Sequence, residues 1–277
     1  MHLPNDDNVN TEYWDLRQDK IVTNIGKWEG GNDVIIRGYS LFNDLFDKVS
    51  YFQILALNAT GKLISAELSR WIENSFMVMS YPDARIWCNQ VGALSGTMGV
   101  SPSAATAAGS LSADSRIYGT SKSQYVAMTF IGCSLSDFKK GVSVETLIGK
   151  LPIKQGMPAA PGFVRPVAKD DERIAPFRKM TARLGFESGE HLTLADKISS
   201  FMEERYSTSI NIGGFFAAFL MDQGFSPMDA YKLYCLAVSS GVTACHSDNL
   251  QHPENSFLPL RCDQIEYTGH KIRSVDG

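Results

Sequence analysis

Residues 161–173 read Pro-Gly-Phe-Val-Arg-Pro-Val-Ala-Lys-Asp-Asp-Glu-Arg. It carries two arginines, Arg165 and Arg173. An arginine cannot act as a general acid at physiological pH, but its planar fork can clamp a carboxylate or stabilise an oxyanion. The alternative for both arginines is a surface ion pair with a nearby acid such as Asp171 or Glu172. The stretch therefore predicts an anion-binding loop, with simple ion pairing as the competing interpretation.

The composition is that of an ordinary soluble protein. The chain has 277 residues, 44% hydrophobic and 20% charged, with a net charge of -4, which suits one large domain or two unequal ones. Its Lys and Arg residues are dispersed, whereas a nucleic-acid groove concentrates them beside exposed aromatics. No apolar run approaches the roughly 20 residues that span a bilayer, and the first ten residues are polar and acidic. We expect no nucleic-acid or membrane partner, and a cytoplasmic location.

The cysteines and histidines predict neither a disulfide framework nor a metal site. The five cysteines are scattered and never form a Cys-x-x-Cys pair, so we expect most of them to be reduced thiols in the core. His246, Asp248 and His252 form another cluster with ligand chemistry, but their spacing does not place them one helical turn apart around a metal. We interpret them as helix-terminal capping residues and solvated histidines.

Helical patterns dominate the chain. Residues 20–25 and 33–37 have β character and flank the turn-rich Glu29-Gly30-Gly31-Asn32, which predicts one hairpin. Apolar residues then recur at helical spacing in residues 66–80 and 193–206. Ser226 and Pro227 supply an N-cap and a first helical residue, starting a helix that runs to about Cys245. We therefore predict a mainly α fold.

Two of the expected helices are rich in small residues. Residues 83–99 carry Gly92, Ala93, Gly96 and Gly99, and each Gly costs a helix roughly 1 kcal/mol relative to Ala. Tertiary packing must compensate, by letting another helix approach closely. Residues 103–112 have the same character, so the two segments predict either a tight interface or a buried pair of helices within the chain.

Several segments, in the correct order, resemble the citrate synthase family. Residues 161–173 are similar to its Pro-Gly-Phe-Gly-His pattern followed by Asp-Pro-Arg, and residues 83–99 to the helix at its dimer interface. Further matches lie near both ends of the chain: Thr23-Asn24-Ile25, Gly30-Gly31, Arg37-Gly38-Tyr39, Pro259-Leu260-Arg261 and Tyr267-Thr268-Gly269. The length suits the shorter members, which include proteins resembling citryl-CoA lyases.

The resemblance implies a citrate-synthase-like architecture. Residues 1–121 and 223–277 would form a large helical domain, residues 122–222 a smaller helical domain, and the N-terminal β-hairpin would be short. It also implies a homodimer, a coenzyme A thioester as a possible substrate, a carboxylate ligand and no permanently bound cofactor. Arg261, in the C-terminal signature, is assigned to coenzyme A binding.

Citrate synthases join acetyl-CoA to oxaloacetate, and the resemblance implies a division of labour. An Asp removes a methyl proton, one His stabilises the enol, a second His assists the oxo-acid carbonyl, and arginines bind carboxylates. An acetyl thioester is a weak carbon acid, so the reaction needs both a positioned base and a hydrogen-bond donor for the developing enolate.

The two family histidines are replaced here. Tyr118 stands at the first His position. Its phenol can donate a hydrogen bond to an enolate oxygen, but its unperturbed pKa of about 10 makes it a poor proton shuttle at neutral pH. The alternative for Tyr118 is a structural aromatic. Arg165 stands at the second His position, and Arg173 matches the carboxylate-binding Arg.

The family base is also replaced. It normally stands in an Asn-hydrophobic-Asp sequence that opens a helix, and the match is Asn211-Ile212-Gly213, whose glycine has no side chain to take a proton. Asp222 lies more than two helical turns away and cannot simply inherit the role. Val238 matches a further carboxylate-binding Arg.

Two functions are compatible with these replacements. The first is a divergent coenzyme A thioester enzyme that makes or breaks a carbon-carbon bond, using Tyr118, Arg165 and Arg173. The second is a non-catalytic relative that keeps the scaffold and acts as a binding or regulatory partner. In both cases we expect ordinary citrate synthase activity to be absent.

Overall fold

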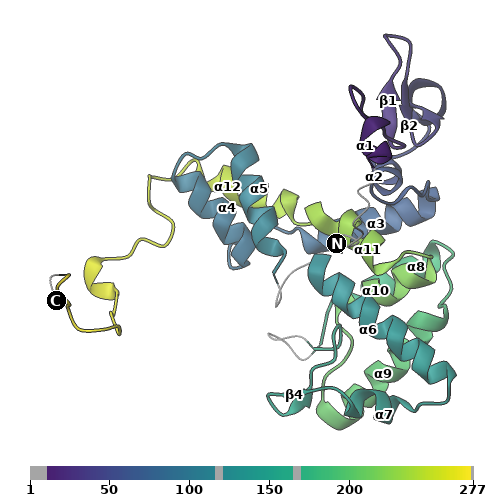
Figure 1. The fold of residues 1–277 in the computed structure, drawn as a ribbon. Helices are drawn as coiled ribbons and strands as arrows, with labels where there is room; N and C mark the ends of the chain where they lie inside the picture. Colours follow the sequence, from purple (N-terminus) through teal and green to yellow (C-terminus); the bar gives the residue numbers. More distant parts are fainter. Residues whose placement is uncertain (1–10, 116–120, 165–169, 276–277) are drawn as a thin grey trace. The chain divides into compact units, whose positions relative to one another are not determined.

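The structure is a computed structural model, and it describes residues 11–115, 121–164 and 170–275. Internal contacts divide the chain into two units, Met1–Ala66 and Glu67–Gly277. Helices make up most of the ordered elements and the strands are short, so the predicted mainly α fold is confirmed (Figure 1). The expected boundaries around residues 122–222 divide the chain in a different way and stay a prediction.

The first unit combines a small antiparallel sheet with short helices. Its buried apolar residues include Leu45, Ala56 and Leu57. Ser50 caps the last helix with a full capping box. In chain order the elements are α1 (Glu12–Asp15), β1 (Gly26–Trp28), β2 (Val34–Ile36), β3 (Tyr39–Ser40), the π-helical turn η1 (Leu41–Leu45) and α2 (Tyr51–Thr60).

The predicted hairpin is present, but its first strand lies later in the chain than expected. β1 pairs with β2 so that Gly26 faces Ile36 and Trp28 faces Val34, which leaves residues 20–25 outside the strand. The reason is at the far end of β2, where Arg37 and Gly38 both have positive φ and turn the chain into β3. Because β2 ends there, it offers no partners for residues 20–24.

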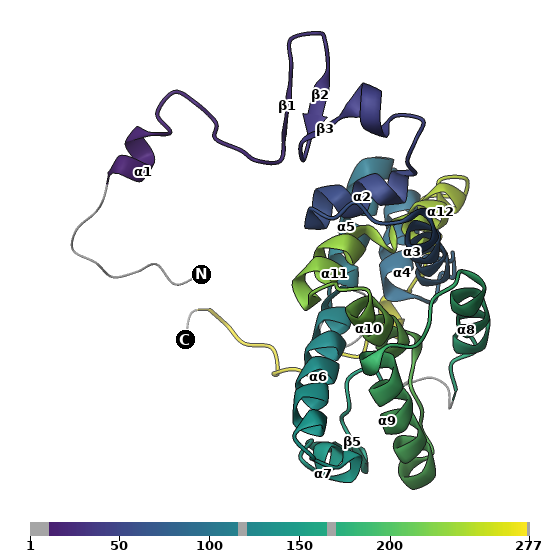
Figure 2. The ribbon, with the colours of Figure 1, turned by 90° about the vertical axis from the view of Figure 1, so that its right-hand side faces the viewer.

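Two groups of mutually packed helices make up the second unit. In the first group α4 (Trp87–Thr97), α5 (Pro102–Ala113) and α12 (Ser239–Asn249) contact one another. In the second, the long α6 (Ser121–Lys139) lies beside α9 (Glu190–Tyr206), α10 (Ile212–Asp222) and α11 (Pro227–Leu233), as Figures 1 and 2 both show. The remaining elements are α3 (Ala66–Met79), α7 (Val144–Gly149), β4 (Ile153–Lys154), β5 (Met157–Pro158), α8 (Ile174–Arg183), η2 (Tyr234–Leu236) and η3 (Cys262–Gln264).

A buried tryptophan joins three helices of this unit. Trp71 of α3 stacks on Phe219 of α10 with ring centroids 4.1 Å apart, and its edge-on neighbours include Phe177 of α8. Its indole Nε1–H donates to Thr181 Oγ1 at 2.8 Å, so the one polar atom of the ring is satisfied inside the core. This cluster fixes α10 against α3 and α8.

The small residues of α4 serve close packing within the chain. A Cβ on Gly92 would lie 2.5 Å from the Val242 carbonyl oxygen, and one on Gly96 would lie 2.5 Å from the His246 carbonyl oxygen. These glycines therefore let α12 approach α4 at backbone distance, which is the intrachain alternative. An interface between copies of the chain stays a prediction.

Two predicted helices have different limits in the structure. The helix expected from residue 83 begins at Trp87, because the Asp83 carboxylate accepts from the backbone N–H and guanidinium of Arg85 instead of capping a helix. The helix expected over residues 226–245 is interrupted between Leu233 and Ser239. A short 3-10 turn (Tyr234–Leu236) follows Leu233, and in the first turn of α12 the Gly241 N–H donates to Ser80 Oγ at 2.8 Å, a long-range contact.

Two expectations about side-chain environment are wrong. His246 is fully buried, and its Nε2 lies 2.7 Å from the Val100 carbonyl oxygen, so it is not a solvated histidine. Of the five free cysteines only Cys88 and Cys245 are buried, so most of them lie outside the core. Across the described residues no helix is long and apolar enough for a bilayer crossing, and no three His, Cys, Asp or Glu side chains gather as a metal site requires.

Candidate functional site

The start of α10 holds the loop formed by residues 161–164. Asn211, the N-cap residue of α10, donates from its backbone N–H to the Gly162 carbonyl at 2.9 Å and from its side-chain amide to the Val164 carbonyl at 2.7 Å. The Thr208 hydroxyl donates to the Phe163 carbonyl at 3.0 Å, and the Phe163 ring is fully buried. The loop backbone is therefore fixed at consecutive carbonyl groups.

A contact between two glycines allows this close approach. Gly162 has φ +87°, a left-handed conformation that favours glycine, and a Cβ there would lie 2.7 Å from Gly214 Cα. A Cβ on Gly214 would lie 2.2 Å from the Gly162 carbonyl oxygen. Any side chain at either position would push the loop away from the first turn of α10.

Asp171 and Arg173 form the second attachment of this segment to α10. The Asp171 carboxylate accepts two bonds of 2.8 Å from Arg173, at Nε and Nη2, and a third of 2.8 Å from the Ile212 N–H. The Asp171 side chain is 1% exposed and that of Arg173 is 22% exposed. Burial alone would raise the pKa of Asp171, but the Arg173 fork and the backbone donors outweigh it, so this pKa lies below its ordinary value.

This pair is the ion-pairing alternative that the sequence offered for Arg173. Asp171 takes two of the five guanidinium N–H donors and fixes the plane of the fork. The predicted role of Arg173 as a carboxylate ligand stays a prediction.

Tyr118 and Arg165 lie outside the described residues, so their predicted roles stay predictions. Gly213, at the position matched to the family base, lies in the first turn of α10. A Cβ on Gly213 would meet a single close atom, Asn211 Oδ1 at 3.2 Å. A side chain at Gly213 would therefore need a small shift of the Asn211 amide, whereas one at Gly214 would collide with the backbone of the loop.

Asp222 is committed to a structural task at the other end of α10. Its carboxylate accepts from the backbone N–H of His191 at 2.9 Å and of Leu192 at 3.0 Å, and His191 Nδ1 lies 2.8 Å from the same carboxylate. It thus caps the first turn of α9. That Asp222 does not take over the role of the base stays a prediction.

A cavity of about 360 Å³ lies against the 161–164 loop, and we call it the loop cavity. Its other walls are the first turns of α6 and the hairpin of β4 and β5. Among the described residues that line it, Lys154 is the one ionisable side chain. The lining consists of Ser123, Val126, Lys154, Gln155, Met157, Pro158, Ala159, Ala160, Pro161, Gly162, Val164 and Asn211.

Arg261 lies elsewhere, beside the short η3 turn of the C-terminal segment. Its backbone N–H donates to Gln264 Oε1 at 2.8 Å, and it is exposed. It does not belong to the lining of the loop cavity, and its predicted role in coenzyme A binding stays a prediction.

Sequence reasoning missed two residues that build this site. The sequence places Asn211 in a motif but does not indicate that its side chain binds the loop, although an Asn just before a helix is a recognised N-cap signal. Gly214 gave no signal, because its requirement comes from a loop distant in the sequence.

Comparison with known proteins places the chain through its structure. No protein-family model matches the sequence, and no curated protein matches it. Solved structures do match. Citryl-CoA lyase from Hydrogenobacter thermophilus has a TM-score of 0.77 and 23% identity, covering 92% of this chain and 97% of that chain.

Two further solved structures are larger proteins. ATP citrate lyase from Methanothrix soehngenii, in complex with citrate and coenzyme A, has a TM-score of 0.73 and 17% identity, covering 100% of this chain and 46% of that one. Citrate synthase from the archaeon Thermoplasma acidophilum, in a ternary complex with carboxymethyl coenzyme A and oxaloacetate, has a TM-score of 0.57 and 13% identity, covering 82% and 60%. The chain therefore has the fold shared by these proteins, as the sequence resemblance predicted.

Proposed function

We propose that this chain, with the citrate synthase fold, binds a coenzyme A thioester and a carboxylate ligand beside the 161–173 segment. The reaction would be a divergent making or breaking of a carbon-carbon bond, without ordinary citrate synthase activity. The observation that carries the proposal is the loop cavity, whose wall is the loop that resembles the family's substrate-binding segment. Its volume of about 360 Å³ is within the usual range for small-ligand sites.

The described residues around the loop cavity suit anion binding. Lys154 supplies a positive charge to its lining, and the Asp171–Arg173 pair lies in the adjoining segment. Coenzyme A carries phosphates and the second ligand a carboxylate, so both would be favoured by cationic groups. We propose Arg165 and Arg173 as carboxylate ligands, Tyr118 as a hydrogen-bond donor to an enolate oxygen, and Arg261 as a coenzyme A contact.

The relatives support the ligand classes. ATP citrate lyase was solved with citrate and coenzyme A, and citrate synthase with carboxymethyl coenzyme A and oxaloacetate. We extend these classes to this chain, and we further propose a cytoplasmic homodimer with the smaller domain at residues 122–222. Sedimentation at several concentrations would test the dimer.

A specific observation favours a non-catalytic alternative. The lining of the loop cavity, among its described residues, holds no carboxylate and no imidazole, and Gly213 offers no side chain at the position of the family base. Proton removal from the thioester methyl group needs such a group. The chain would then be a binding or regulatory partner that retains the ligand pocket.

The first experiment measures binding. A ligand that binds only the folded state at a hundred times its Kd stabilises it by about 2.7 kcal/mol, which raises Tm by roughly 5 °C in a protein of this size. We expect such a shift with coenzyme A or acetyl-CoA, and a smaller one in Lys154→Met. Lys179→Met, which removes an exposed lysine of α8 outside the cavity lining, should behave like the parent protein. No shift with any acyl-CoA, citrate or oxaloacetate at saturation would refute the proposal.

The second experiment separates the enzyme from the binding protein. With acetyl-CoA in deuterium oxide, a catalytic chain exchanges the acyl α-hydrogens, and a binding protein does not. Release of free coenzyme A from acetyl-CoA and oxaloacetate, at a rate typical of enzymes, would contradict the expected loss of citrate synthase activity.

A further inference from the structure

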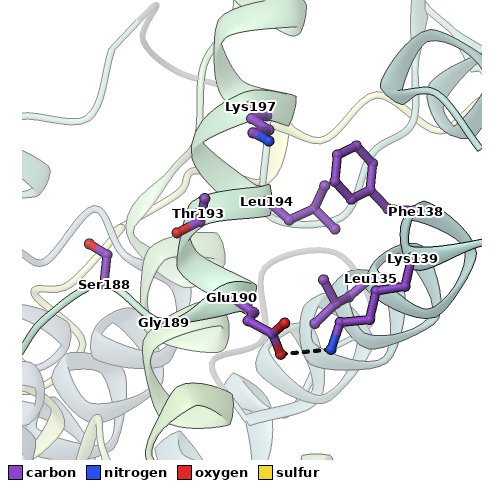
Figure 3. A pocket seen from close by; sticks show the side chains of 9 residues that line it. All are labelled: Leu135, Phe138, Lys139, Ser188, Gly189, Glu190, Thr193, Leu194 and Lys197. Carbon is purple, nitrogen blue, oxygen red and sulfur yellow. Dashed lines mark hydrogen bonds and ion pairs between the residues drawn. The ribbon is translucent and has the colours of Figure 1, made fainter. Parts of the chain in front are cut away.

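A second cavity lies between α6 and α9, and we call it the α6–α9 cavity (Figure 3). Its volume is about 370 Å³. Leu135, which is 8% exposed, and Leu194, which is 1% exposed, give it an apolar floor, and the half-buried Phe138 ring extends that floor. Polar and charged side chains line the rest. An apolar floor with a few polar groups is typical of small-ligand sites.

The charges around this cavity do not cancel. The Lys139 ammonium pairs with Glu190 at 2.7 Å, as the dashed line in Figure 3 shows, and the pKa of Glu190 is lowered by that hydrogen bond and charge. The Lys197 ammonium lies 4.9 Å from the centroid of the Phe138 ring. No carboxylate of the described residues pairs with Lys197. The cavity therefore has one uncompensated positive charge beside an aromatic face.

The walls of the cavity are held in place without a ligand. Asp222 caps the first turn of α9, immediately after the wall residue Gly189. A Cβ on Gly189 would lie 2.4 Å from Asp222 Cγ, so the glycine is needed for that capping. A preformed wall reduces the ordering cost that a ligand would otherwise meet on binding.

This cavity is separate from the loop cavity. The two linings share no residue. The α6 residues of the loop cavity end at Val126 and those of the α6–α9 cavity begin at Leu135, which is about 13 Å along the helix at the usual rise per residue. A ligand in one cavity therefore need not involve the other.

We propose that the α6–α9 cavity binds a small amphipathic monocarboxylate. The aliphatic or aromatic body of the ligand packs on Leu135, Leu194 and Phe138, and its carboxylate pairs with the Lys197 ammonium. A neutral analogue lacks that pairing, and an ammonium analogue is repelled by it. The site would add a second ligand to the protein, independent of the coenzyme A site proposed above.

Calorimetric titration of the whole chain with hexanoate tests the assignment. We expect saturable binding that is on the order of fivefold weaker in Lys197→Met, the usual scale for a partly solvated ion pair. Lys140→Met removes a neighbouring exposed lysine outside the lining and should leave binding unchanged. Thr193→Trp, which adds bulk to a lining residue without changing charge, should abolish binding.

Two analogues of hexanoate test whether binding depends on the carboxylate. Hexanamide should bind about as weakly to the parent protein as hexanoate does to Lys197→Met, and hexylamine should not bind. No saturable binding of hexanoate would overturn the proposal, as would binding that survives both Lys197→Met and Thr193→Trp. Because the linings are separate, the thermal shift with coenzyme A is expected to be the same in these variants, so failure here is distinguishable from failure of the proposed function.

Discussion

Replacing Asp171 by Asn tests whether the buried ion pair holds the 161–173 segment to α10. Asn keeps an oxygen that can accept from the Ile212 N–H, but it removes the charge that Arg173 binds with two bonds of 2.8 Å. Breaking a buried pair by removing one partner costs about 3 to 5 kcal/mol. Because Arg173 is 22% exposed and regains some hydration, we expect a loss of about 3 kcal/mol in the free energy of unfolding.

The chain contains a matched control for this change. Asp83 and Arg85 have the same spacing as Asp171 and Arg173, and Arg85 also binds its aspartate through Nε and Nη2. The Arg85 side chain, however, is 90% exposed. Asp83→Asn should therefore change the free energy of unfolding much less than Asp171→Asn, because solvent screens and replaces an exposed pair.

The effect of Asp171→Asn should depend on pH in a definite direction. The pKa of Asp171 is lower in the folded state than in the unfolded state, where it is about 3.9. The ionised carboxylate therefore stabilises the fold fully above the unfolded-state pKa, and this stabilisation is lost as the pH falls through the folded-state pKa. The difference in the free energy of unfolding between the parent protein and Asp171→Asn should be constant from about pH 7 to pH 5 and become smaller below about pH 4. Urea denaturation followed by circular dichroism measures it. Equal losses in Asp171→Asn and Asp83→Asn, or a gap that widens in acid, would refute the reasoning.

Three further changes test the site. Gly162→Ala should lower the free energy of unfolding by about 3 kcal/mol, because Gly162 has a positive φ and contacts α10. Gly156→Ala, at φ +80° in open space, should lower it by about 1 to 2 kcal/mol. Urea denaturation measures both losses, and equal losses would contradict the close contact of Gly162. Asn211→Ala removes the N-cap and the bond to the Val164 carbonyl, so the free energy of unfolding should fall by about 2 kcal/mol. Coenzyme A should also bind more weakly in the thermal-shift assay, and unchanged binding would show that the loop does not contribute to the ligand site. Gly213→Asp introduces a carboxylate at the matched base position, where a helix N-terminus favours it, and should increase α-deuterium exchange of acetyl-CoA. Absence of any increase would count against that alignment.

The sequence predicts elements whose signals are local. The amphipathic pattern of residues 193–206 falls within α9, and Ser226 is the N-cap of α11 as expected. The errors arise where a competing partner intervenes. Asp83 has the side chain of an N-cap but binds Arg85, and the Gly241 N–H, in the first turn of α12, donates to Ser80 from a distant part of the chain. Such competition cannot be inferred from periodicity.

In the candidate site, too, local contacts can be predicted from the sequence and contacts between distant residues cannot. The sequence offers Asp171 as an alternative partner for Arg173 because the two are neighbours, and the structure contains that pair. It gives no sign of the contact between Gly162 and Gly214, since both requirements depend on a partner far away in the chain. It also misplaces His246, whose burial results from three helices packing together.

The residues of this region that match the family fall into two physical groups. Gly162, Arg173 and Asn211 each help to fasten the 161–173 segment to α10, directly or through Asp171, so the fold needs them whether or not a reaction takes place. Gly213 belongs to the other group, because a side chain there would meet one close atom, Asn211 Oδ1 at 3.2 Å, and no backbone of the loop. If the matched position does correspond to the family base, a glycine in its place would change the chemistry at little structural cost. We propose that the scaffold is kept while the ordinary reaction is not, and the Gly213→Asp exchange experiment tests this proposal more directly than any substitution at Arg173.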